Sequence, residues 1–128
     1  MSTEQERKML EAAAKACGYG ELIFCNGADD DGYDNGVWKY TLRRDESGKL
    51  LLWNPLSNHS DTAEMCANLG ICTLWGNEFV EMMLSDDFNG TTTCFAHYKD
   101  HDNSRLKAWM YAAMMCAAKI GGYEDAHP

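Results

Sequence analysis

The stretch SRLKAWMYAAMMCAAKI (residues 104–120) is the part of the chain that decides how we interpret its fold. Its apolar residues recur with the 3.6-residue period of a helix. Asn103 or Ser104 is suited to cap the start of that helix, and Gly121-Gly122 is suited to end it. The part from Ala108 to Ala118 is apolar on nearly every side, so we predict that this helix is the most buried element.

One stripe of this helix is expected to face a β-sheet, because its members are spaced by four, three and four residues: Trp109, Ala113, Cys116 and Ile120. The opposite side carries Met115 with Tyr111 or Ala118, where a helix lying on a surface would carry Lys or Glu. A second surface must therefore cover it, either another part of this chain, a twin subunit or a partner. Met115 is accordingly a candidate interface residue.

Working outward from this helix, two more helices are predicted. The segment from Thr3 to Cys17 begins with a capping box, since Glu6 stands three residues after Thr3. A central helix is predicted from Asn58 or Ser60 to Leu69, where Gly70 ends it.

Between the helices lie short runs with strand patterns, namely Glu21–Cys25, Val37–Leu42, Leu50–Trp53, Ile71–Trp75, Phe79–Leu84 and Thr91–Tyr98. Gly76-Asn77 is suited to a primed hairpin turn. No repeat or linker divides the chain. The sequence therefore predicts a single α+β domain over residues 1–128, with an antiparallel sheet of about four to six strands packed by N-terminal, central and C-terminal helices.

The net charge and the cysteines limit the partners and the cellular compartment that we expect for this protein. The 128 residues include 20 acidic and 11 basic side chains, a formal net charge of −9. Such a surface repels nucleic acid and leaves basic proteins, metal ions and cationic ligands open as partners. The alternative is that the charge serves only to keep the protein in solution. The start of the chain has no secretory pattern and no run is long enough to span a membrane, so we expect a protein of the bacterial cytoplasm. Its six cysteines are then expected to be reduced.

The loop from Asn26 to Gly36 is the first candidate ligand site, with carboxylates at Asp29, Asp30, Asp31 and Asp34. It does not fit an EF-hand: with Gly32 in the sixth position, the twelfth position falls on Trp38, which has no carboxylate. A loose cation site and a solvated loop both remain open.

Cys94, His97 and His101 form the second candidate, because thiolate and imidazole are the ligands that zinc prefers. On a strand, however, Cys94 and His97 point to opposite faces, so a site requires a shorter strand and a further ligand. The chain has no phosphate-binding loop, no nucleophile elbow and no zinc-protease motif. We therefore expect a protein without catalytic activity and without a cofactor.

A resemblance rests on the residues that join the hairpin to the central helix. These are Trp53-Asn54-Pro55-Leu56, Asp61, Ala63 and Leu69-Gly70-Ile71, with a weaker likeness at Ala112–Gly121. The pattern resembles small accessory proteins of tailed phages, including a phage alpha-beta-alpha sandwich group, which have no established activity. The long hairpin from Val37 to Trp53 and the acidic loop depart from the short forms of that family.

The resemblance implies a phage or prophage accessory protein, and the charge suggests that it binds a host or phage protein, such as a nuclease or defence protein that it inhibits. A homodimer is a further expectation. Within the motif, Trp53 is either an architectural joint or an exposed binding residue. The alternative function is a metal- or small-ligand-binding protein, including a hydrolase, that uses Cys94, His97 and His101 or the loop from Asp29 to Asp34.

Overall fold

The computed structural model describes residues 3–25, 40–86 and 90–124. The elements follow one another as α1 (Thr3–Cys17), β1 (Ile23–Cys25), β2 (Tyr40–Arg44), β3 (Leu50–Leu52), α2 (His59–Leu69), β4 (Cys72–Trp75), β5 (Phe79–Asp86), β6 (Gly90–His97), a short 3₁₀ helix η1 (Tyr98–His101) and α3 (Arg105–Ile120). The predicted α+β class, with three helices and antiparallel strands, is confirmed.

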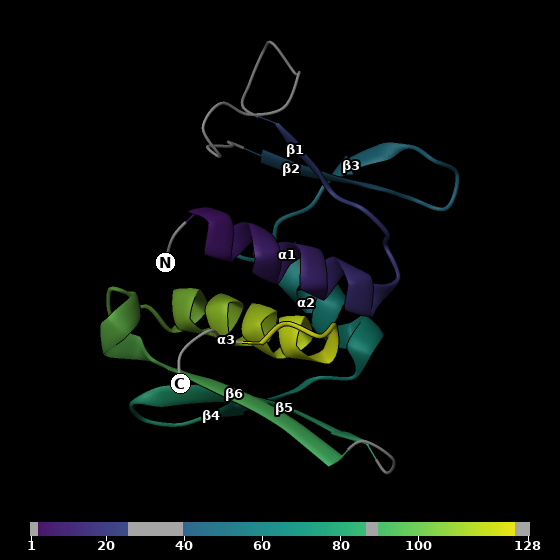
Figure 1. Cartoon of the computed structure of the whole chain (residues 1–128). Helices are drawn as coiled ribbons and strands as arrows, with labels where there is room; N and C mark the ends of the chain where they lie inside the picture. The colour runs from purple at the N-terminus through teal and green to yellow at the C-terminus, as the bar shows by residue number, and fades with distance from the viewer. Residues whose placement is uncertain (1–2, 26–39, 87–89, 125–128) are drawn as a thin grey trace.

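The helices form the middle of the molecule and the sheets form its two outsides (Figure 1). One sheet contains β1, β2 and β3 in that order, and the other contains β4, β5 and β6. In Figure 1 the first sheet lies above α1, and α3 lies between α1 and the second sheet. The six strands thus make two antiparallel sheets rather than one, and each sheet has one inner face and one outer face.

The boundaries of α2 and the start of α3 agree with capping residues predicted from the sequence. The Asn58 side chain accepts a hydrogen bond from the backbone N–H of Asp61, and the Ser104 side chain accepts one from that of Lys107. Gly70 ends α2 with a φ of 76°, a left-handed conformation in which glycine carries no steric penalty.

The hairpin between β4 and β5 differs from its prediction. The last bonded pair is Gly76 with Phe79, whose carbonyl accepts a hydrogen bond from the Gly76 N–H at 2.8 Å, so Asn77 and Glu78 are the central residues of the turn. Neither has a positive φ. The prediction of a primed turn centred on Gly76-Asn77 is therefore wrong, because primed turns require φ above zero at one or both central positions and neither Gly76 nor Asn77 has it.

The core is built around α3, which is buried from Ala112 to Ala118 without a break. Its Trp109 Nε1 donates to Thr73 Oγ1 at 3.1 Å and its Cys116 Sγ donates to the Thr92 carbonyl at 3.8 Å, so this side faces the β4–β6 sheet as predicted. The opposite side packs along α1 and α2.

Within the described residues, no helix is long and apolar enough to cross a membrane.

Candidate protein-binding surface

The outer face of the β4–β6 sheet is the principal candidate site. Burial alternates along β6, where Cys94 and Ala96 are buried and their neighbours are not, and the antiparallel register extends the alternation to β5 and β4. Of the described side chains, those of Val80, Met82, Leu84, Thr92, Cys94 and Ala96 face α3, and the odd-numbered ones face outward. We call the outward set the outer face: Cys72, Leu74, Phe79, Glu81, Met83, Ser85, Thr91, Thr93, Phe95 and His97.

Three aromatic rings form a cluster on the outer face. The centroids of Phe79 and Phe95 are 5.9 Å apart, and the His97 ring lies 5.8 Å from the first and 5.7 Å from the second. Phe95 is nevertheless 59% exposed and Phe79 39% exposed, with Leu74 at 48% on the far strand. Clustered apolar side chains in water are typical of surfaces that bind another molecule.

Glu81 lies in the middle of this apolar surface. It belongs to the central strand, and its register partners are Leu74 on one side and Phe95 on the other. It is the one carboxylate of the outer face, and none of the outer-face residues is Lys or Arg. A carboxylate that is covered by a partner must be paired, so the surface favours a partner that brings a cation to this point.

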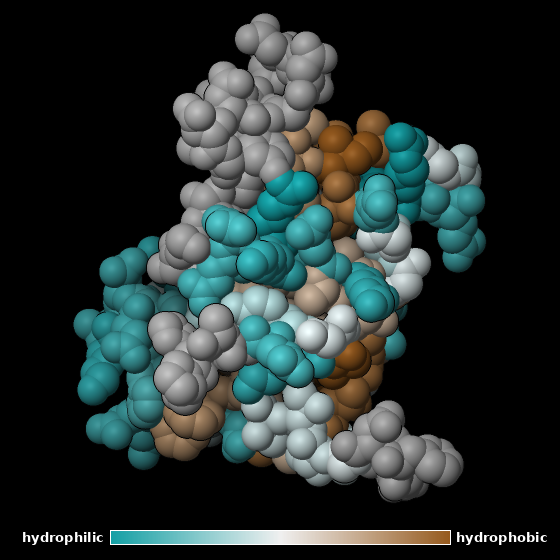
Figure 2. Space-filling model, viewed as in Figure 1, coloured by the Kyte–Doolittle hydropathy of each residue, from teal (hydrophilic) through white to brown (hydrophobic). Residues whose placement is uncertain are grey.

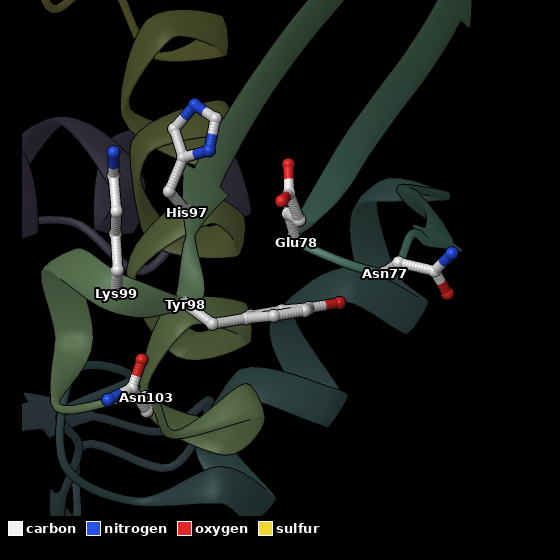
Figure 3. A pocket seen from close by; sticks show the side chains of 6 residues that line it. All are labelled: Asn77, Glu78, His97, Tyr98, Lys99 and Asn103. Carbon is white, nitrogen blue, oxygen red and sulfur yellow. The ribbon is translucent and has the colours of Figure 1, made fainter.

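A polar pocket of about 330 Å³ adjoins one end of the outer face. Figure 3 shows Glu78, His97 and Lys99 rising on the same side of the Tyr98 ring, whereas the Asn77 amide points away from them. The pocket thus combines a carboxylate, an imidazole and an ammonium group, which can bind a small polar ligand or the polar side chains of a partner.

Tyr98 holds this end of the sheet in place. Its hydroxyl lies 2.7 Å from the Gly76 carbonyl oxygen and 3.0 Å from that of Phe79, and its backbone N–H donates to the Glu78 carbonyl. The Arg105 guanidinium lies 4.8 Å from the centroid of the Tyr98 ring. The hairpin turn and the start of α3 are therefore fixed relative to each other, which keeps the rim of the pocket rigid.

A second recess, about 510 Å³, lies beside the end of β6. It is bounded by Phe95, His97 and His101, by Tyr111 of α3, and by the carboxylates of Glu6 and Asp100. The His101 and Tyr111 rings are 4.8 Å apart. His97 lines both cavities, so the outer face continues into an acidic recess at its edge.

The opposite sheet also has an exposed apolar face. Leu52 is 68% exposed and Leu50 42%, and Figure 2 shows hydrophobic side chains gathered over this sheet at the top of the view, next to hydrophilic ones. These two leucines lie on the edge strand β3, whereas the outer face of the β4–β6 sheet carries a cluster of three rings. We therefore rank this face second.

A third polar region lies between α1, α2 and β2, around a pocket of about 540 Å³. Arg43 lies over the Tyr19 ring at 4.1 Å and pairs with Glu64 at 3.2 Å, and Asn68 donates to the Tyr19 hydroxyl at 3.0 Å. Burial is the largest cause of the raised pKa of Tyr19. Apart from Arg43 Nε, which is buried without a hydrogen-bond partner among the described residues, these groups pair with one another, as is typical of a structural joint between elements.

The structure does not bring the predicted zinc ligands together. Cys94 is buried against α3, His97 is on the outer face, and His101 follows on η1 against Tyr111. Strand β6 continues to His97, so the alternation separates the first two side chains. No group of three or more His, Cys, Asp or Glu side chains among the described residues is placed to hold a metal ion.

Two other predicted binding residues are core residues. Trp53 is 1% exposed, with its ring edge-to-face with Tyr19 at 5.5 Å, so the architectural interpretation of the motif holds and the exposed one is wrong. Met115 is 9% exposed because α1 and α2 of the same chain pack on that side of α3. The surface that covers it is therefore neither a twin subunit nor a partner.

The motif around Trp53 is held by its polar residues. The backbone N–H of Asn54 donates to the Asp61 carboxylate at 2.9 Å, and the Asn54 side chain accepts from the Leu56 N–H at 2.9 Å. The Thr62 hydroxyl donates to the Pro55 carbonyl at 2.7 Å. These contacts fix the entry to α2. The carboxylates Asp29, Asp30, Asp31 and Asp34 lie outside the described residues.

All six cysteines are free in the structure. Burial raises the pKa of Cys17 and of Cys66 to about 11. Cys94 differs: a hydrogen bond from the Cys116 thiol, helped by the charge of Lys119, lowers its pKa to about 7. The same interaction raises the pKa of Cys116.

Sequence reasoning missed Phe79, Glu81 and Phe95. The period-two alternation of β5 and β6 places them on one face, but a strand pattern alone does not say which face a helix covers.

Comparison with protein-family models, with curated proteins and with solved structures finds no match to this chain.

Proposed function

We propose that this chain is a phage- or prophage-type accessory protein that acts without catalysis, by binding a protein partner through the outer face of the β4–β6 sheet. The observation that carries the proposal is the exposed aromatic cluster, in which Phe95 is 59% exposed although two other rings lie within 6 Å of it. A partner that covers such rings removes apolar area from water, worth about 2 kcal/mol or more for a central aromatic residue.

The charge suggests the class of partner. The chain carries a net charge of −9, and Glu81 requires a cation when the face is covered. A second copy stacked on the same face brings another Glu81 and no outer-face Lys or Arg, so it suits the site poorly. A basic host or phage protein suits it well, and a nuclease or defence protein with a basic groove belongs to this class.

The test is capture of partners from host lysate by the wild-type chain and two charge variants, quantified by mass spectrometry. Phe95→Asp changes the proposed surface, and Leu52→Asp is the matched control on the other sheet, where the side chain is similarly exposed. We expect Phe95→Asp to reduce recovery of the partner by about tenfold or more and Leu52→Asp to leave it nearly unchanged. Equal recovery with all three proteins contradicts the proposal.

The alternative is a small-ligand-binding protein, including a hydrolase, at the pocket in Figure 3. It is supported by Glu78, His97 and Lys99, which point to the same side and offer groups of both charges. Binding of a small polar ligand that is lost in His97→Ala but kept in Phe95→Asp favours this alternative over the protein partner.

A further inference from the structure

We propose that the free edge of β6 is a docking strand, which pairs through its backbone with an extended, basic segment of the partner protein. The inference rests on the proposed function and specifies how the partner is recognised. It would add a fourth strand to the β4–β6 sheet, beside the aromatic cluster of the outer face.

The register shows which backbone groups of β6 are unpaired. β6 is an edge strand, because the order of its sheet is β4-β5-β6. The Tyr98 N–H donates to the Glu78 carbonyl, so this pair is hydrogen-bonded across the strands. In an antiparallel ladder the bonded pairs recur every second residue, which assigns Thr92, Cys94 and Ala96 to the bonds with β5. The N–H and C=O groups of Thr91, Thr93, Phe95 and His97 therefore point to the open edge.

This edge lacks the features that normally block pairing with another chain. Proteins protect long edge strands with Pro, Lys, a bulge or a covering element. β6 is eight residues long, reads GTTTCFAH, pairs with β5 without a break in register, and carries neither Pro nor Lys. In the described parts of the chain, no backbone group outside the sheet bonds to Thr91, Thr93, Phe95 or His97. Within the residues that the structure describes, the edge is thus open to a further strand.

The recess beside the edge indicates the chemistry of the docking segment. Phe95 and His97 bound it on the strand side, and Glu6, Asp100 and Tyr111 bound it on the helix side. Side chains of an added strand alternate between the two faces of the sheet. Residues on the helix side would meet the carboxylates of Glu6 and Asp100, and those on the outer side would lie next to Phe95. A segment in which Lys or Arg alternates with apolar residues would therefore pair with the carboxylates on the helix side and cover Phe95 on the outer side.

The same chemistry distinguishes this occupant from a second copy of the chain. Antiparallel pairing of two β6 strands would bring the sequence GTTTCFAH into the recess. That sequence has no Lys or Arg, so Glu6 and Asp100 would be left without a cation. The acidic recess therefore favours a basic segment of another protein.

Amide hydrogen exchange of the wild-type chain tests the edge directly. The probes are two synthetic peptides, Lys-Val-Lys-Val-Lys and Glu-Val-Glu-Val-Glu. We expect the amides of Thr91, Thr93, Phe95 and His97 to exchange rapidly in the free protein and about tenfold more slowly with the lysine peptide, but not with the glutamate peptide. No slowing with the lysine peptide, or equal slowing with both, overturns the inference. Slowing that grows with protein concentration alone also overturns it, because the occupant is then a second copy.

A pair of substitutions separates this inference from the proposed function. Thr93→Pro removes an N–H that points to the open edge and leaves the bonds to β5 intact, and Thr93→Val is the control that keeps the N–H. We expect Thr93→Pro to lose partner capture and peptide-dependent protection, and Thr93→Val to keep both. If Thr93→Pro captures the partner normally while Phe95→Asp does not, the edge inference is wrong and the proposed surface stands. If neither variant loses the partner, the proposed function fails as well.

Discussion

Substitution of Gly121 by alanine is expected to separate α1 from α3. Gly121 follows the last residue of α3, and its φ of −81° is ordinary for any residue. What requires glycine here is the lack of space for a side chain. A Cβ built on Gly121 would overlap the carbonyl oxygen of Ala12 and would lie 2.7 Å from the carbonyl carbon of that residue. These are backbone atoms of α1, so no side-chain rotation relieves the overlap.

The expected loss of stability follows from this geometry. Carbon atoms in contact prefer about 3.5 Å or more, so the new methyl group must displace the backbone of α1 by nearly 1 Å or more. Overpacking of this kind typically costs 1–3 kcal/mol, and a rigid helix backbone places Gly121→Ala at about 3 kcal/mol or more. For a domain stable by roughly 5–15 kcal/mol, this loss is a large fraction of the total.

The matched control is Gly18→Ala. Nothing lies within 4 Å of a Cβ at Gly18, but its φ of +78° is left-handed, so alanine there costs about 1–2 kcal/mol of conformational energy. Urea unfolding monitored by tryptophan fluorescence gives both free energies. If Gly121→Ala lowers the free energy of unfolding no more than Gly18→Ala does, α1 and α3 do not approach each other as closely as the structure shows. The conclusion that α1 covers Met115 would then lose its support.

Two other predictions concern the core. Met115→Lys should lower the free energy of unfolding by at least about 3 kcal/mol, since it buries an unpaired charge between helices; a neutral effect on the urea midpoint would place Met115 at the surface. The second is a pH dependence: because the folded-state pKa of Cys94 is about 7, below its ordinary 9.0, its contribution to stability should grow as pH rises from 7 to 9. As pH approaches and passes 9, the raised pKa values of Cys116, Cys17 and Cys66 act in the opposite direction. The urea midpoint should therefore rise from pH 6.5 to 8.5 in the wild type and not rise in Cys94→Ala, and an equal rise in both would exclude Cys94 as its source.

Most of the secondary structure could be predicted because its signals are local. Asn58, Ser104 and Gly70 act on the backbone within a few residues of themselves, and each limits a helix where the sequence indicated. The turn at Asn77 and Glu78 could not be predicted in the same way. Its conformation is held by the Tyr98 hydroxyl, which comes from a residue about twenty positions away.

Most of the candidate site could not be predicted from the sequence. Met115 was singled out because it is apolar on the second side of its helix, and Trp53 because it belongs to the motif before α2. A large apolar side chain in such a place suits a core and an interface equally well. The structure buries both of them and exposes Phe95. Cys94 and His97 illustrate the opposite case, since strand alternation alone predicted that they point apart and the structure agrees.

The sequence by itself determined the helices, the strands, the capping residues and the acidic charge, because each depends on composition or on contacts between near neighbours. Only the tertiary structure decided that the strands form two sheets on opposite sides of the helices. That arrangement uses one face of each sheet for the core and leaves the other face in water, so whether an apolar residue is buried depends on elements far away in the chain. That choice of face leaves Phe95 and Glu81 on the outer side of their sheet, and the strand order leaves β6 at its edge.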